Sequence, residues 1–251
     1  MQLHISPNID QLSISVADWM VTCINETLQK QDSFTLVLSG GSTPKKLNAL
    51  LASDTYKNKI DWSKVHIFFG DERFVPLNDE RSNAKLAYDT LLNHVNVAAE
   101  NIHVMPTENI SPEDAAKAYE AILKRYFPSV NGQWSMVNGQ PQTFDLIFLG
   151  MGDDGHTLSL FPGKTEVIHE TEKLCTSLWL EAQDMYRITL THPIVNNAAK
   201  IAFLVNGSGK AKALYQVLKG EYNPDLYPSQ IINPLNGELH WFVDEAASEN
   251  L

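Results

Sequence analysis

Apolar residues along the chain follow two spacings, which predict strands that alternate with helices. Short apolar runs are typical of buried strands, whereas apolar residues three and four positions apart are typical of the buried face of a helix. Such runs predict strands at residues 34–38, 65–69, 144–149, 174–180, 187–190, 201–205 and 240–243. The helical spacing predicts helices at residues 9–24, 44–51, 83–92, 112–126 and 208–218. The polar residues 129–142 are interpreted as an insertion or a surface loop.

This alternation predicts a single α/β domain over residues 1–251, with a mostly parallel, Rossmann-like sheet and helices on both of its faces. Sheets of this kind bind ligands beyond the carboxyl ends of their strands. Polar clusters at residues 39–43, 70–73, 150–156 and 206–210 each follow an apolar run directly. We therefore expect these four clusters to meet on one rim of the sheet.

The composition argues against several classes of protein. Of the 251 residues, 43% are hydrophobic and 20% are charged, which is ordinary for a soluble globular chain. The net charge of -11 argues against binding to nucleic acid or to an anionic membrane, although a local group of cations would still bind a phosphorylated small molecule. No apolar run is long enough to span a bilayer and the first residues do not resemble a signal peptide, so we expect a cytoplasmic protein.

Metal and covalent chemistry have no signature in the sequence. Cys23 and Cys175 are the only cysteines, and neither a His-Glu-x-x-His nor a Cys-x-x-Cys pattern occurs. There is also no Gly-x-Ser-x-Gly elbow of the kind that serine hydrolases carry. We therefore expect no metal and no cofactor. The sequence makes no prediction of the oligomeric state.

The loop after the strand at 34–38 is a candidate phosphate cradle. It consists of Ser39, Gly40, Gly41, Ser42 and Thr43. Two glycines let backbone amides turn inward, and the N-terminus of the following helix attracts anions. A tight, well-capped turn is an equally good interpretation. We expect Ser42 or Thr43 to cap this helix and Pro44 to take its first position.

Asp154 and His156 are candidates for acid–base chemistry. Residues 150–155 match the Gly-x-G-x-x-G dinucleotide pattern, but two carboxylates would then face a pyrophosphate, so we reject that interpretation. Two positions apart on a glycine-rich turn, Asp154 and His156 can face one pocket. Histidine titrates near neutrality, which suits a general base. The alternative is a histidine that only bridges loop backbone.

Three cationic residues at the ends of predicted strands or just after them are candidates for binding an anion. Arg73 comes after Asp71, and a guanidinium presents a rigid fork of donors to a carbonyl or phosphate oxygen. Lys210 follows a Gly-Ser-Gly turn at the start of a helix, and Arg187 begins a strand. Each has an ordinary alternative: a surface ion pair at residues 71–73, an exposed arginine on an edge strand, and a solvated lysine on a helix.

Taken together and in order, these clusters resemble the motifs of 6-phosphogluconolactonases. The similar segments are residues 36–44 (LVLSGGSTP), 69–76 (FGDERFVP) with Ser82 and Asn83, 150–157 (GMGDDGHT) with 159–163, 187–191, 209–211 and 241–247. Each motif alone is weak evidence, but together they span nearly the whole chain.

The resemblance implies hydrolysis of 6-phospho-D-glucono-1,5-lactone to 6-phosphogluconate in the pentose phosphate pathway, without metal or cofactor. It also implies the fold shared by sugar-phosphate isomerases and deaminases. His156 then corresponds to the general base, Asp71 and Asp154 to acidic residues of the catalytic site, and Arg73 to a substrate contact. Arg187, Lys210 and the glycine-rich loop correspond to the phosphate pocket, with the division of contacts between Arg73 and Arg187 left open.

Two other functions are weighed against this one. Glucosamine-6-phosphate deaminases resemble the chain at the Asp-Gly-His turn, but they carry a glutamate where this chain has Phe161 and an Asp-Glu-Tyr motif where it has Arg73. A non-catalytic sugar-phosphate binding module would keep the phosphate groups and lose the base. Because His156 and Asp154 are both present, an enzyme is favoured.

Overall fold

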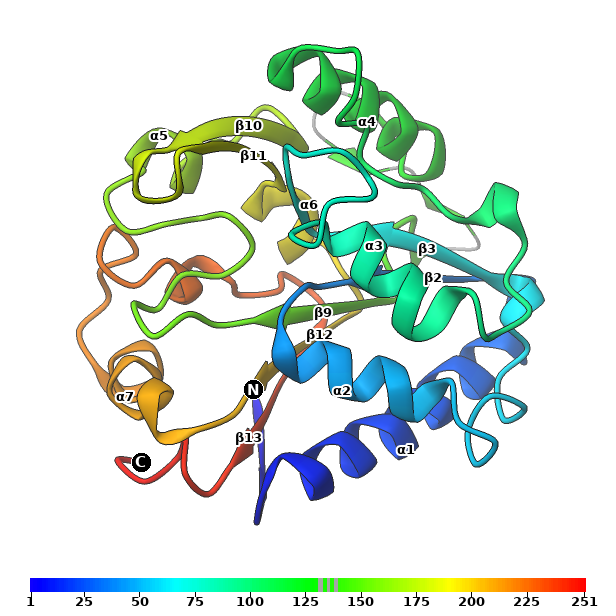
Figure 1. Cartoon of the computed structure of the whole chain (residues 1–251), viewed down its shortest axis with the longest axis horizontal. Helices are drawn as coiled ribbons and strands as arrows, with labels where there is room; N and C mark the ends of the chain where they lie inside the picture. The colour runs from blue at the N-terminus through cyan, green and yellow to red at the C-terminus, as the bar shows by residue number, and fades with distance from the viewer. Residues whose placement is uncertain (131–132, 135, 138–139) are drawn as a thin grey trace.

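A six-stranded sheet whose strands are all parallel forms the centre of the molecule (Figure 1). The computed structural model describes residues 1–251 except 131–132, 135 and 138–139. In spatial order the strands are β1 (Gln2–Ser6), β13 (Glu238–Asp244), β12 (Lys200–Val205), β9 (Leu146–Gly150), β2 (Phe34–Leu38) and β3 (Val65–Phe69). This sheet confirms the predicted parallel α/β architecture.

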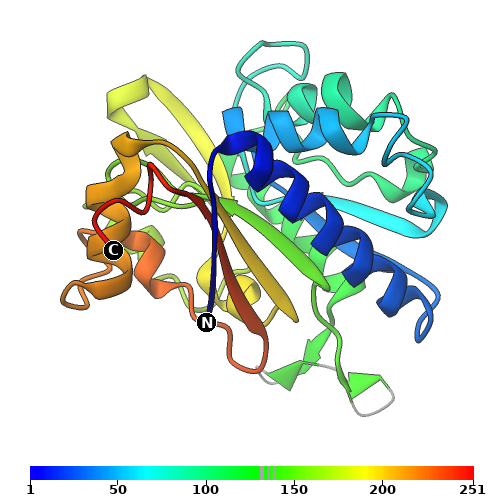
Figure 2. The same ribbon diagram turned by 90° about the horizontal axis from the view of Figure 1, so that it is seen from below.

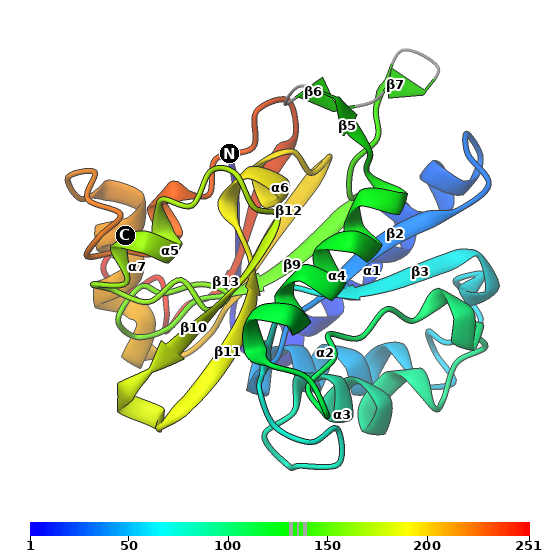
Figure 3. The same cartoon turned by 90° about the horizontal axis from the view of Figure 1, so that it is seen from above.

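Helices cover both faces of the sheet, as the alternation of elements predicts. One face packs against α1 (Ile9–Leu28), α2 (Ser42–Leu51) and α3 (Asn83–Ala87) with its π-helical continuation Tyr88–Leu92. The other face packs against α4 (Pro112–Tyr126), α5 (Thr165–Ile168), α6 (His192–Asn196) and α7 (Ala211–Lys219). Figure 2 shows α1 in front of the strands, and Figure 3, seen from the opposite side, shows α4 in front of them. Of the helices in the described part of the chain, none is long and apolar enough to cross a membrane.

The side chains of each strand alternate between the two layers because successive residues of a strand point to opposite faces. Leu36 and Leu38 of β2 belong to the core beneath α1 and α2, whereas Val37 belongs to the core beneath α4. All three are buried. The near-continuous apolar strands in the sequence are therefore explained by a sheet that is covered on both sides.

A second, antiparallel sheet lies beside the first and carries part of the predicted site. Its order is β10 (Cys175–Leu180), β11 (Met185–Leu190) and β4 (Asp71–Arg73). In the register of β11 with β4, Arg187 lies opposite Arg73 and Thr189 lies opposite Asp71. The interpretation of Arg187 as an exposed arginine on an edge strand is therefore wrong, since β11 is the central strand of this sheet and Arg187 is 4% exposed.

Most predicted elements are confirmed, and the differences have local causes. The sequence pattern missed β1, because the edge strand Gln-Leu-His-Ile-Ser contains no continuous apolar run and its two apolar side chains, Leu3 and Ile5, are exposed. Residues 129–142, interpreted as a loop, contain the short ladders β5 (Ser129–Val130) with β6 (Gln133–Trp134) and β7 (Met136–Val137) with β8 (Gln140–Pro141). Five residues of that segment lie outside the described chain. The remaining short helices are Trp62–Lys64, Ala99–Asn101, Glu181–Gln183, Ser208–Lys210 and Pro228–Ile231.

Replacing Phe203 with alanine tests the packing of the central strands. The ring of Phe203 stacks on Trp241 of the neighbouring strand, with the centroids 3.9 Å apart, and both side chains are buried. We expect Phe203→Ala to lower the free energy of unfolding by about 3–5 kcal/mol, because it removes this contact and leaves a cavity. Urea unfolding measures the change. Tyr222→Ala, at a 68% exposed position, is the control; a loss below about 1 kcal/mol for Phe203→Ala would contradict the packing described.

Candidate active site

A cavity of about 340 Å³ opens at the carboxyl ends of β2, β9 and β12. It is lined by Ser39, Gly40, Gly41, Ser42, Thr43, Pro44, Asp71, Arg73, Asn83, Gly150, Met151, Gly152, His156, Leu158, Phe161, Gln183, Arg187, Leu204, Val205, Asn206 and Lys210. The lining includes residues from all four polar clusters of the sequence. The clusters therefore meet at one edge of the sheet, as their positions after the strands predict.

The helix α2 begins two residues earlier than expected, so Pro44 is its third residue and the prediction that Pro44 takes the first position is wrong. Gly41 is the N-cap residue with a φ of 109°, a conformation that favours glycine, and the helix begins at Ser42. Neither Ser42 nor Thr43 caps the helix through its side chain, so that expectation is wrong. The Thr43 hydroxyl instead donates a hydrogen bond to Oδ1 of Asn206, which joins the loop after β2 to the loop after β12.

His156 lies on a turn that is held by its own backbone and by Asp154. The backbone N–H of Gly152 donates to the carbonyl of His156 at 2.8 Å. Oδ1 of Asp154 accepts from the backbone N–H of His156 at 3.0 Å and lies 2.6 Å from Nδ1 of its ring. Because Nδ1 is engaged by this carboxylate, Nε2 is the ring nitrogen that can accept a proton from a ligand.

The electrostatics of this pair favour an ionised Asp154. Burial raises the pKa of Asp154, but its hydrogen bonds with the ring and the backbone of His156 outweigh burial and hold the pKa below its ordinary value. On another side of the imidazole, the ring of Phe161 packs with its centroid 4.3 Å from that of His156. The ring of His156 is therefore located by one charged and one apolar neighbour.

A distant segment of the chain anchors the same turn. Gly155 has a φ of 80°, and its carbonyl accepts hydrogen bonds from both the backbone N–H and the hydroxyl of Ser229, at 3.0 and 2.8 Å. Tyr227 packs against Gly155 so closely that a Cβ there would lie 2.9 Å from its ring. The sequence offered no signal for Ser229, because its partner is 74 residues away.

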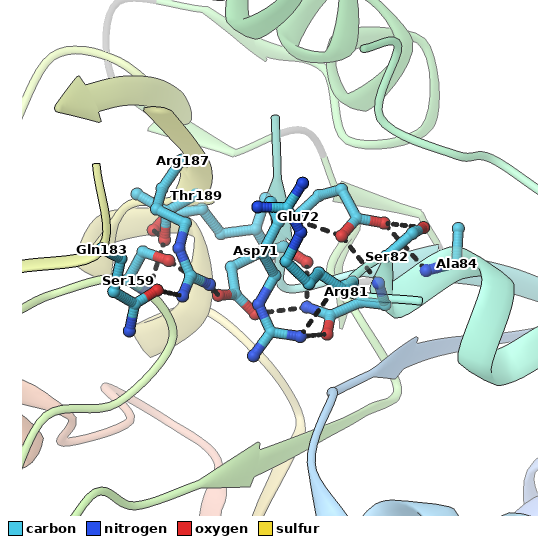
Figure 4. A network of polar contacts seen from close by, with 12 residues as sticks. Asp71, Glu72, Arg81, Ser82, Ala84, Ser159, Gln183, Arg187 and Thr189 are labelled. Carbon is cyan, nitrogen blue, oxygen red and sulfur yellow. Dashed lines mark hydrogen bonds and ion pairs between the residues drawn. The ribbon is translucent and has the colours of Figure 1, made fainter. Parts of the chain in front are cut away.

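Asp71 and Arg187 form a buried ion pair beside the cavity (Figure 4). Oδ2 of Asp71 lies 3.6 Å from Nη1 of Arg187 and accepts a hydrogen bond from the Ser159 hydroxyl at 2.7 Å. Burial lowers the pKa of Arg187, while Asp71 opposes that effect. Nη2 of Arg187 donates to Gln183, whereas its Nε is buried and has no hydrogen-bond partner among the described residues.

The other two cations enter the cavity from different elements. Nη1 of Arg73 donates to the carbonyl of Arg81 at 3.0 Å and to Oδ1 of Asn83 at 2.5 Å, which leaves the guanidinium anchored at one side. Lys210 ends the short helix that follows Gly207, whose φ is 90°. A protein of net charge -11 thus gathers Arg73, Arg187 and Lys210 around one cavity, which suits an anionic ligand.

The candidates named from the sequence are brought together by the fold. Ser39 through Thr43, Asp71, Arg73, His156, Arg187 and Lys210 all line the cavity, and Asp154 reaches it through His156. Asn83 and Gln183 also line it, although nothing in the pattern assigned them a role. Within the described chain, no group of three or more histidine, cysteine, aspartate or glutamate residues is arranged to hold a metal ion.

An imidazole–carboxylate pair and a group of cations at the carboxyl edge of a parallel sheet define a class of α/β enzymes that act on small anionic substrates. The chain belongs to the family described as glucosamine-6-phosphate isomerases/6-phosphogluconolactonase, whose model matches residues 7–241. The 6-phosphogluconolactonase of Nostoc sp. is 37% identical over 99% of this chain and 98% of its own length. That of Synechocystis sp. is 38% identical over 92% of this chain and 90% of its own length.

Solved structures agree with this assignment. A crystal structure of a devB protein superposes with a TM-score of 0.86 at 34% identity, covering 100% of this chain and 99% of that chain. The 6-phosphogluconolactonase of Thermotoga maritima has a TM-score of 0.80 at 26% identity, covering 97% of this chain and 99% of that chain. A monomeric glucosamine-6-phosphate deaminase has a TM-score of 0.82 at 17% identity, with full coverage of both chains, and shows the shared fold alone.

Replacing Gly152 with alanine tests the geometry of the His156 turn. A Cβ on Gly152 would overlap with the ring of His156 and the carboxylate of Asp154. We expect Gly152→Ala to move the imidazole while the sheet stays folded. Histidine ring signals in NMR spectra measure this: those of His156 should shift, whereas those of His240, buried on β13, should not. Unchanged His156 signals would contradict the contact.

Proposed function

We propose that the protein hydrolyses 6-phospho-D-glucono-1,5-lactone to 6-phosphogluconate, a step of the pentose phosphate pathway. One observation carries the proposal: His156, placed to act as a general base, shares a single cavity with Arg187 and Lys210, placed to bind an anionic group. The full-length similarity to proteins named 6-phosphogluconolactonase supports the same substrate.

In the proposed reaction His156 activates the attacking water. Nε2 takes a proton as the water oxygen adds to the lactone carbonyl, and Asp154, hydrogen-bonded to Nδ1–H, stabilises the imidazolium. The tetrahedral intermediate then collapses, the bond from the carbonyl carbon to the ring oxygen breaks, and the imidazolium returns its proton to that oxygen. A positioned base of this kind contributes about 10²- to 10⁴-fold to the rate.

The cations have a separate task at the far end of the substrate. We assign the phosphate to Lys210, Arg187 and the loop from Ser39 to Thr43, and a further substrate contact to Arg73. Binding energy from the phosphate would orient the lactone carbonyl toward His156. Arg187 lines the cavity, and its Nε has no hydrogen-bond partner among the described residues, so donor capacity of this guanidinium is not used up within that part of the chain.

Asp71 has a different proposed role from His156. Its carboxylate already accepts hydrogen bonds from Ser159 and Asn83 and faces Arg187. These partners occupy the oxygens that a proton-transfer role would need. We therefore propose that Asp71 acts by orienting Arg187 and Asn83 at the edge of the cavity.

We also propose that residues 1–251 work as one domain in the cytoplasm. The parallel pairing of β1 with β13 joins distant parts of the chain in a single sheet, which supports one domain. Cys23 and Cys175 are free and buried, which is typical of a reducing compartment.

Removing the imidazole tests the role of His156. We expect His156→Ala to lower kcat about 10²- to 10⁴-fold, because the attacking water loses its base. The measurement is acid release from freshly prepared 6-phosphogluconolactone, with spontaneous hydrolysis subtracted. Near-normal rates would remove His156 from this role, and ammonia release from glucosamine 6-phosphate by the wild type would indicate deaminase activity instead.

Removing the ammonium group of Lys210 tests the phosphate site. We expect Lys210→Ala to raise KM about 10- to 100-fold, which corresponds to one lost hydrogen bond to a charged group. Lys212→Ala is the matched control, since Lys212 lies two positions further along the chain and is exposed. An unchanged KM in Lys210→Ala would place the phosphate elsewhere.

A further inference from the structure

Glu72 is a buried carboxylate that stands between two residues of the cavity wall. Its side chain is 3% exposed, and its two oxygens accept four hydrogen bonds. Oε1 accepts from the backbone N–H groups of Arg73 and Asn83, at 2.8 and 2.7 Å. Oε2 accepts from the Ser82 hydroxyl and the backbone N–H of Ala84, at 3.0 and 2.8 Å. Figure 4 shows Glu72 facing Ser82 and Ala84.

These four donors belong to two different elements of the chain. Arg73 belongs to β4, whereas residues 82–84 lie at the start of α3. All four donors are uncharged, although the charge of Arg187 also interacts favourably with Glu72. Burial raises the pKa of Glu72 in spite of these hydrogen bonds. Burial of a carboxylate that has no salt bridge within the described residues is costly, so we infer that the position of Glu72 serves the geometry of its neighbours.

The residue that Glu72 locates most directly is Asn83, whose side chain lies in the cavity wall. Oδ1 of Asn83 accepts from the guanidinium of Arg73 at 2.5 Å, and its Nδ2 donates to the carbonyl and to Oδ1 of Asp71, at 2.8 and 3.1 Å. A side chain on Gly40 would overlap with the Asn83 amide, so the glycine-rich loop fits against it. Glu72 therefore locates both ends of Arg73: its backbone directly, and its guanidinium through Asn83.

We propose that Glu72 is a positioning residue that holds the guanidinium of Arg73 in the cavity by locating Asn83. The inference rests on the proposed function in one respect, namely that Arg73 contacts the lactone substrate. Glu72 itself lies outside the lining of the cavity as far as the described residues define it, so it acts through Arg73 and Asn83.

Glu72→Gln tests this inference with little change of shape. The new amide nitrogen cannot accept hydrogen bonds, so two of the four donors lose their acceptor. We expect kcat/KM to fall about 10- to 100-fold, because small displacements of a positioning group have effects of that size. In the Arg73→Ala background the same substitution should have no further effect, since the group that Glu72 positions is already gone.

A matched control separates positioning from general destabilisation. Asp145 is another carboxylate held by uncharged donors: the backbone N–H and hydroxyl of Thr35, at 2.7 and 2.8 Å, and Nε2 of Gln31, at 2.9 Å. It precedes β9 and so lies at the end of that strand opposite the cavity. We expect Asp145→Asn to lower the unfolding midpoint and to leave kcat/KM per folded molecule unchanged.

The outcomes of the experiment are distinct. Wild-type kcat/KM in Glu72→Gln, or an equal loss in the Arg73→Ala background, would overturn the inference. If Glu72→Gln does not fold, Ser82→Ala removes a single donor and should show a smaller loss with the same dependence on Arg73. If the wild type lacks lactonase activity, the proposed function fails, and the inference is then decided by crystal structures. In Glu72→Gln the contact between Arg73 and Asn83 should be lost, whereas its retention would refute the role of Glu72.

Discussion

The site depends on the way that one glycine joins two sheets. The backbone N–H of Gly70 donates to the carbonyl of Leu38 in the parallel sheet at 3.0 Å, and its carbonyl accepts from Leu190 of the antiparallel sheet at 2.8 Å. A Cβ at this position would lie 2.7 Å from the side chain of Leu158. Gly70 is thus the single residue between β3 and β4. The register of β4 with β11 brings Arg73 and Arg187 to the cavity at the carboxyl edge of the parallel sheet.

The charges of the cavity are arranged so that acidic residues hold basic and titratable ones in place. Asp71 faces Arg187, Asp154 contacts His156, and Glu72 locates the backbone of Arg73. Because these anions are fixed by the fold, the cations and the imidazole need little reorganisation when a negatively charged substrate enters. The excess of acidic residues in the chain is therefore compatible with an anion-binding cavity.

The parts of the site that the sequence predicts are those that follow from local rules. Polar clusters after apolar strands predict one rim, because the carboxyl ends of parallel strands share an edge. The burial of Arg187 was not predictable in this way, since it arises from the pairing of β11 with β4, more than a hundred residues apart. Ser229 was missed for the same reason, since its partner Gly155 is 74 residues away. The role of Glu72 was missed although its partners are near in sequence, because no spacing rule relates a strand carboxylate to the donors at the start of the next helix.

Some residues hold the site in place without lining the cavity, others line the cavity directly, and the two kinds are constrained differently. Ser229 holds the turn of His156 without lining the described cavity, and its replacement would alter whatever chemistry that turn supports. Phe161, by contrast, lies against the imidazole and lines the cavity. A carboxylate at position 161 would place a second anion beside the imidazole and would change the proton transfers open to it without disturbing the hydrogen bonds of the turn. Differences in reaction within such a fold are therefore expected at positions like Phe161, and similarity of fold is maintained by positions like Ser229.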